Sequence, residues 1–351
     1  MNRRTILTAC GTAIAGTLAG CNSSDPSKTT ATESSTATQT TTAKPTPTPV
    51  PADPEVTAAL ETARPKAAAA FESLQSMQVI KDGEIGLGPD EGFIEFANHD
   101  RDDVYDPLTV VRDTLVPVRE QGTETQQARV EALLSFGEYT NTKYQEYTAL
   151  AEGFSRLYRG IDAYLNDELN EAYEFFTEMR EDLATISQKR VAADKLLDQF
   201  AADGVDTSIE PFSIADEQAE QTYVSTLVYR WEPAVRGLKR QIRGIGNFSM
   251  AGTAFEAGEY ERCVRLARTA RGSFETVEET ISTALDRDAS LFSSFLTLIS
   301  CRSTAFIESA RTRRAAGESG VAGDERIASR KYESSNSQFE QAFRDCDGDS
   351  A

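Results

Sequence analysis

The sequence predicts an all-α protein of long antiparallel helices, arranged as an array of helical hairpins or as a long-helix bundle. Two observations support this prediction. Apolar residues recur at alternating spacings of three and four, which is the period of one helix face. The apolar–polar alternation typical of strands is absent after residue 53, and few prolines follow residue 54.

Four apolar series define the expected helices. They run from Val130 to Leu165, Leu169 to Phe200, Val224 to Ile245 and Tyr260 to Ala284. A period of about 3.5 residues keeps one seam of each helix facing its neighbour and favours shallow crossing angles. We therefore expect long helices that lie side by side.

Turn-forming residues indicate where the helices end. The expected connections are Asn166-Asp167-Glu168, Gly258-Glu259, a longer break around 204–213, Asp286 to Ser290, and Gly317 to Gly323. The glycine-rich stretch from Lys81 to Gly92 is the expected irregular insertion. Pro65 and Pro233 fall inside helical stretches and are expected to kink or break them.

The helical domain is expected to span 54–346, with a subdivision near 204–213 left open and a disordered acidic tail over 347–351. Three of the five cysteines lie in this domain. Cys263 occupies a small-residue position of the fourth series, so we expect a buried thiol there. Cys301 and Cys346 form a candidate disulfide pair, which the sequence alone does not place.

Acidic residues outnumber basic ones by 56 to 36, which gives a formal net charge of -20. This excess argues against binding to nucleic acid, whose phosphates require a positive surface. Arginine supplies most of the positive charge, and an acid-rich, lysine-poor composition resembles proteins of salt-loving archaea. At molar salt the screening length is about 3 Å, so carboxylates repel one another little.

The N-terminus reads as an export signal. Arg3 and Arg4 form a twin-arginine pair, followed by a mildly apolar stretch with no acidic residue as far as Gly20. This stretch ends in Leu18-Ala19-Gly20-Cys21, which resembles a lipobox, in which the cysteine is lipidated before cleavage. Thr5 and Ile6 replace the bulky aromatic residue usual after the pair, which leaves the general secretory route open.

Together these features resemble the twin-arginine lipoprotein signals of haloarchaea. The resemblance implies that 1–20 is a cleaved signal peptide and that Cys21 carries the lipid. The protein is then exported and anchored to the outer face of the cytoplasmic membrane. The rest of 21–53 is rich in Ser, Thr and Pro and poor in apolar residues, so we expect a disordered stalk.

Two hairpins of the helical domain look related. Ala163-Tyr164, Asp167-Glu168-Leu169 and Ala172 match Ala254-Phe255, Gly258-Glu259-Tyr260 and Cys263 at a constant shift of 91 residues. The pattern resembles tetratricopeptide repeats, in which small residues flank a Gly-acid-Tyr turn. The helices are longer than that family's unit allows, so a non-repeating long-helix bundle is the alternative.

No pattern of catalytic residues is found, so we expect neither an enzyme nor a bound cofactor or metal. His99 is the only histidine, which excludes histidine-rich zinc sites. The acidic stretch from Asn98 to Asp103 contains residues that suit calcium, but it lacks the glycine and distal glutamate of an EF-hand loop. A solvated loop is the favoured interpretation.

The net charge reverses between the two hairpins. Residues 152–182 carry nine acidic and three basic side chains, whereas 230–271 carry nine basic and four acidic ones. Pairing of these charges within the molecule is the favoured interpretation, and a ridge for an anionic partner is the alternative. The candidate ridge consists of Arg236, Lys239, Arg240, Arg243, Arg262, Arg265, Arg268 and Arg271.

These observations favour a cell-surface lipoprotein whose helical domain binds protein or peptide partners at the cell envelope, because helical arrays provide extended binding surfaces. One alternative is a structural spacer of the envelope. Another is a ligand carrier or carboxylate-based enzyme, which requires a pocket lined by converging polar groups.

Overall fold

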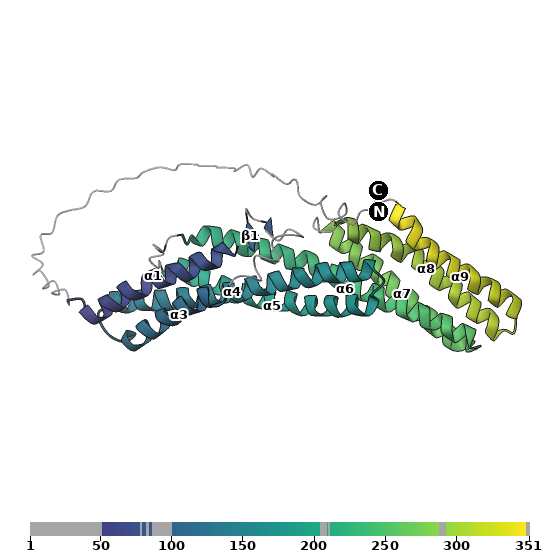
Figure 1. Cartoon of the computed structure of the whole chain (residues 1–351), viewed down its shortest axis with the longest axis horizontal. Coiled ribbons are helices and arrows are strands. Elements are labelled where there is room, and N and C mark those ends of the chain that lie inside the picture. Colours follow the sequence, from purple (N-terminus) through teal and green to yellow (C-terminus); the bar gives the residue numbers. More distant parts are fainter. Residues whose placement is uncertain are drawn as a thin grey trace, which may run out of the picture.

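The computed structural model of the chain describes residues 51–77, 79–81, 84–85, 100–203, 209, 211–287 and 293–348. Within these residues eight α-helices lie side by side in an elongated, bent rod, with α1 and α3 near one end and α8 and α9 at the other (Figure 1). The prediction of an all-α protein with long antiparallel helices is therefore confirmed. The signal, Cys21 and most of the stalk lie outside the described residues.

The first part of the rod packs around the beginning of α4. Helix α1 (Pro54–Ser76) starts at Asp53, whose side chain accepts hydrogen bonds from the backbone N–H groups of Glu55 and Val56. Helix α3 (Asp102–Leu115) and a short 3-10 helix (Val116–Val118) follow. Two strands of two residues each, β1 (Ile80–Lys81) and β2 (Glu84–Ile85), pair antiparallel at the expected irregular insertion.

Six long helices follow, each antiparallel to the next. Helices α4 (Glu124–Leu165) and α5 (Leu169–Asp203) form the first hairpin. Helices α6 (Ile214–Glu256) and α7 (Tyr260–Asp286) form the second. Helices α8 (Ser293–Val321) and α9 (Glu325–Gly348) form the third. At 1.5 Å per residue, α4 and α6 are each about 60 Å long.

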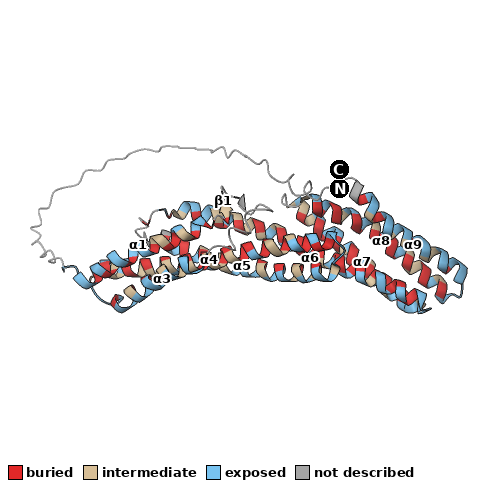
Figure 2. Cartoon of the chain, viewed as in Figure 1, coloured by how far each residue is buried: buried red, intermediate tan, exposed pale blue. Residues whose placement is uncertain are grey.

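The predicted seams form the core (Figure 2). Phe176 is fully buried in the first third of α5, Phe274 is fully buried at the middle of α7, and Trp231 is buried in α6. Glycines let neighbouring helices approach closely: a Cβ on Gly160 would lie 2.6 Å from Phe176, and one on Gly244 would lie 2.4 Å from Phe274. Leu165, the last residue of the first apolar series, is an exception: it lies at the end of α4 and is exposed.

The three hairpins share one turn geometry. A residue in the left-handed region follows each first helix, with φ of 62° at Asp167, 72° at Gly258 and 81° at Gly323. The next backbone N–H donates to the carbonyl five residues earlier, over 2.9, 2.8 and 3.0 Å. Five residues after each left-handed position stands a fully buried small residue. These are Ala172, Cys263 and Ala328. The sequence comparison had related only the first two of these hairpins.

The expected turn from Gly317 to Gly323 begins later in the structure. Gly317 and Gly320 lie inside α8, because they let α7 pack closely: a Cβ on Gly320 would lie 2.4 Å from Tyr260. Of the kinks or breaks expected at Pro65 and Pro233, neither break occurs, since α1 and α6 run through both prolines. The last helix extends to Gly348, two residues into the expected tail.

The cysteines of the domain comprise one disulfide and one thiol. Cys301 near the start of α8 is bonded to Cys346 near the end of α9, with their Cα atoms 5.9 Å apart. The third hairpin is therefore closed by a turn at one end and by a covalent bond at the other. Cys263 is free and buried, as expected, and burial raises the pKa of its thiol.

Candidate functional site

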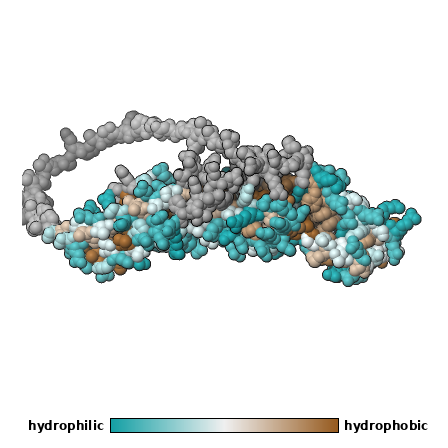
Figure 3. All heavy atoms as spheres, in the orientation of Figure 1, coloured by the Kyte–Doolittle hydropathy of each residue, from teal (hydrophilic) through white to brown (hydrophobic). Residues whose placement is uncertain are grey.

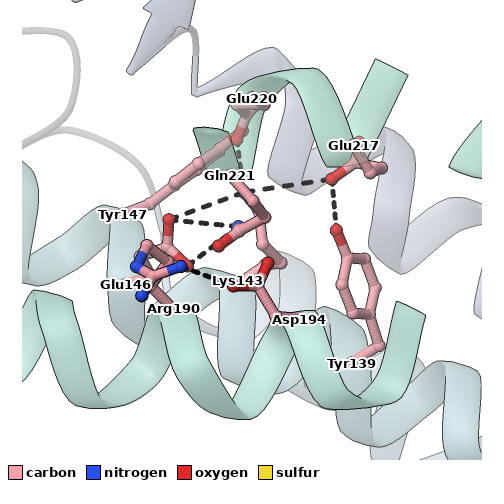
Figure 4. Close-up of polar contacts among 9 residues, drawn as sticks. All are labelled: Tyr139, Lys143, Glu146, Tyr147, Arg190, Asp194, Glu217, Glu220 and Gln221. Atoms are coloured by element: carbon pink, nitrogen blue, oxygen red, sulfur yellow. Dashed lines mark hydrogen bonds and ion pairs between the residues drawn. The ribbon is translucent and has the colours of Figure 1, made fainter. Parts of the chain in front are cut away.

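A buried ionic cluster joins α4 to α6 (Figure 4). Helix α4 supplies Tyr139, Lys143, Glu146 and Tyr147, whose spacings of three and four place them on one face. Helix α6 supplies Glu217, Glu220 and Gln221 from its first two turns. We call these seven residues the Lys143 cluster.

Lys143 is the centre of the cluster, and its side chain is completely buried. Its ammonium forms an ion pair with Glu220, and it lies 3.7 Å from a carboxylate oxygen of Glu146 and 3.9 Å from one of Glu217. Three carboxyl groups therefore surround a single ammonium. Full ionisation would bury a net negative charge, which a low-dielectric interior opposes.

Neutral side chains complete the hydrogen bonding. The hydroxyl of Tyr139 donates to Glu217, and that of Tyr147 donates to Glu220 over 2.6 Å. The amide of Gln221 donates to both oxygens of Glu146, at 3.0 and 3.2 Å. In the described part of the chain, the buried carbonyl oxygen Oε1 of Gln221 has no hydrogen-bond partner.

Burial dominates the protonation of the cluster. It raises the pKa of Glu217 to about 7, with Lys143 opposing the shift and Glu220 adding to it. It also raises the pKa of Glu146, against the opposing effects of Lys143 and Gln221. Burial by itself lowers the pKa of Lys143, but the three surrounding carboxylates outweigh it and the net change is a rise. Lys143 therefore carries a charge at neutral pH.

The sequence interpretation missed this cluster. Tyr147 was counted in the first apolar series, but Lys143, Gln221 and the three glutamates are polar and were not counted, although they occupy core-facing positions. Extending the third apolar series backward from Val224 by three and by seven residues gives Gln221 and Glu217. Tyr139 and Tyr147 stand four residues on either side of Lys143. A lysine flanked in this way on a core-facing seam was the available signal.

A groove lies apart from the cluster. It has a volume of about 930 Å³ between α1 and the first turns of α4, and its apolar lining includes Leu60, Leu133 and Phe136. None of the cluster residues lines it. Hence this groove does not give a substrate access to the buried carboxylates.

The candidate basic ridge divides into two groups. On α6, Arg236, Lys239, Arg240 and Arg243 occupy one face, since they follow at spacings of three and four. Lys239 and Arg243 each lie 5.2 Å from the ring centre of Tyr173 on α5, and Arg243 donates to its hydroxyl. We call the four α6 residues the α6 basic face.

The four arginines of α7 do not form a single face. They follow every three residues, so the first and last, Arg262 and Arg271, point to opposite sides of the helix. Arg262 pairs with Glu259 over 2.8 Å and Arg271 with Glu275 over 2.7 Å. Arg265 and Arg268 are exposed.

Charge pairing between the two hairpins does not account for the α6 basic face. Among the described residues, Arg236 and Arg240 are exposed and form no ion pair. In the acidic hairpin, Arg156 of α4 pairs with Glu178 and Asp182 of α5, over 2.9 and 2.6 Å. Arg236 and Arg240 are therefore available to another anion.

The visible surface is mostly hydrophilic, with scattered apolar patches (Figure 3). Exposed apolar side chains in the described residues include Val116, Val191 and Met250. None of the described helices combines the length and the apolar content that crossing a membrane requires.

Comparison with known proteins finds no matching family model, no matching curated protein and no matching solved structure. The helical fold and the geometry of the two charged sites are therefore the basis for a functional proposal.

Proposed function

We propose that this chain is an exported lipoprotein whose helical array binds an acidic segment of a protein or peptide partner at the cell envelope. The observation that carries the proposal is the exposed Arg236–Arg240 pair, which has no carboxylate partner in the described part of a chain with net charge -20. The tetratricopeptide-like pattern of three hairpins with one turn geometry supports a binding array.

The chemistry of the α6 basic face suits carboxylates. Three of its four residues are arginines, whose planar guanidinium groups bind a carboxylate through two parallel hydrogen bonds. Partial burial lowers the pKa of Lys239, and the charges of Arg180 and Arg243 add to this effect. The positive charges of Arg180 and Arg243, unlike burial, favour an anion bound at this position. High salt screens long-range attraction but weakens direct contacts less. Paired hydrogen bonds from an arginine to a carboxylate therefore matter more there than long-range attraction.

Charge reversal tests this surface. Arg236→Glu with Arg240→Glu, in the intact lipoprotein, is expected to reduce partner capture from detergent-solubilised envelope by about tenfold or more, because like charges then face the acidic segment. The matched control is Arg326→Glu with Arg330→Glu on α9, where both arginines are also exposed and four residues apart. Equal capture by both double variants would contradict the proposal. Binding to anionic lipid vesicles with no protein captured would identify a membrane surface instead.

The anchor is tested separately. Cys21→Ser is expected to release the protein into the medium or to leave it as uncleaved precursor, because the lipobox of Leu18, Ala19 and Gly20 then lacks its lipid acceptor. The measurement is cell fractionation with mass spectrometry of the product. Unchanged membrane association at unchanged mass would show that Cys21 is not the anchor. Replacing Arg3 and Arg4 by lysine in the same assay distinguishes twin-arginine export from the general route.

A structural spacer is the second candidate, and the length of the rod favours it. Helices α4 and α6 each extend for about 60 Å, so the domain can hold two surfaces apart by at least that distance. A spacer requires no specific partner. Two results together would favour this function. The wild-type lipoprotein would capture no partner by its α6 basic face, and deletion of the protein would alter the spacing of the envelope.

A further inference from the structure

The Lys143 cluster contains more acid than its single ammonium neutralises. Three carboxyl groups, Glu146, Glu217 and Glu220, lie within ion-pair distance of Lys143. Glu146 is fully buried and Glu217 is 5% exposed, whereas the side chain of Glu220 retains 17% of its exposure. The cluster therefore has a sealed interior and one edge in contact with water.

Each packed helix contributes charged or titratable groups. Helix α4 contributes Tyr139, Lys143, Glu146 and Tyr147, and α6 contributes Glu217 and Glu220. Helix α5 adds the Arg190–Asp194 ion pair at the border, where Asp194 acts electrostatically on Glu146. The whole set is Tyr139, Lys143, Glu146, Tyr147, Arg190, Asp194, Glu217 and Glu220.

The hydrogen bonding leaves room for one more proton. The amide of Gln221 donates to Glu146, but its carbonyl oxygen has no partner among the described residues. A buried acceptor without a donor is unfavourable. A protonated carboxyl group supplies a donor, and rotation of the Gln221 amide would bring its carbonyl oxygen to the side of Glu146.

We propose that the Lys143 cluster is a proton-operated latch, which holds the first turns of α6 firmly on α4 when it takes up a proton and loosens this contact when it releases the proton. Protonation of Glu217 or Glu146 reduces the buried negative charge, and protonation of Glu146 also provides a donor for Gln221. Release of the proton leaves three carboxylates around one ammonium. The latch is independent of the α6 basic face, which begins 15 residues after Gln221 on the same helix.

The direction of the pH dependence follows from Glu217. Its pKa in the folded protein is about 7, above the usual 4.5, with burial as the main cause. Between these values the folded state binds more protons than the unfolded state. The stability contributed by the proton is therefore present at low pH and is lost as the pH rises through about 7. Glu146, whose pKa is also raised, changes in the same direction.

Hydrogen–deuterium exchange of the full chain tests the latch. Amide protection over residues 217–228, normalised to the intrinsic rate at each pH, is expected to fall by about thirtyfold between pH 5.5 and pH 8.5. Glu217→Gln, a neutral isostere of the protonated acid, is expected to remove most of this fall. Glu232→Gln is the matched control, because Glu232 is exposed on the same helix.

Two outcomes would overturn the latch. One is equal protection of the wild-type residues 217–228 at both pH values. The other is a Glu217→Gln variant that loses protection with pH as the wild type and Glu232→Gln do. Carbon-13 NMR of labelled glutamate gives a measurement that does not depend on the variants' stability. A carboxyl resonance that titrates near pH 7 is expected, and titration of every glutamate near its usual pH would also contradict the latch.

Discussion

Replacement of Phe274 by alanine is expected to destabilise the domain by about 3–5 kcal/mol, through lost apolar burial and the cavity left behind. Phe274 is fully buried at the middle of α7. Its ring contacts the backbone of Gly244 on α6 at a distance that leaves no space for a Cβ, and it lies 5.2 Å from the ring of Phe306 on α8. One side chain thus joins three helices of two hairpins.

Denaturant unfolding in molar salt measures this loss, because salt suppresses differences in charge repulsion. Thr269→Ala is the control on the same helix. Thr269 is exposed, so its replacement is expected to change the free energy of unfolding by less than about 0.5 kcal/mol. Phe176→Ala tests the first hairpin in the same way. If Phe274→Ala unfolds at the denaturant concentration of the wild type, the predicted seam of α7 is wrong.

Replacement of Lys143 by methionine is expected to cost about 3–5 kcal/mol at pH 8, because removal of one partner leaves buried carboxylates without compensation. Methionine keeps a similar length, so the loss of packing is small. At pH 5 the loss should be smaller, since Glu217 and Glu146 have raised pKa values and take up protons more readily than exposed glutamates.

The control for this variant is Lys195→Met, which removes an exposed lysine from α5. Denaturant unfolding of both variants at pH 5 and pH 8 separates loss of charge from loss of the buried interaction. A Lys143→Met variant as stable as Lys195→Met at pH 8 would mean that Lys143 does not balance the carboxylates.

The helices could be predicted from the sequence because burial follows their period. Phe176, Trp231 and Phe274 all occupy predicted seam positions, and all are buried. The turns at Asp167 and Gly258 were also predicted, since their residue types tolerate left-handed backbone. These are local properties of the chain, and a single sequence shows them directly.

Features that depend on neighbouring helices were not predicted. Gly317 and Gly320 look like turn residues in the sequence, but they make room for α7: Gly317 for Val264 and Gly320 for the ring of Tyr260. Lys143 looks like a surface residue until Glu217 and Glu220 approach from another helix, more than 70 residues along the chain. The candidate ridge grouped the α7 arginines with those of α6, although their spacing of three residues already places Arg262 and Arg271 on opposite sides of α7.

The disulfide of the third hairpin has a consequence for proteolysis. Residues 322–324 form an exposed turn, which is a preferred place for a protease to cut. Cys301 and Cys346 lie on opposite sides of that turn, so a single cut there opens a covalent ring instead of dividing the chain. Both pieces stay attached, and the nicked protein keeps α9 in place until the disulfide is reduced.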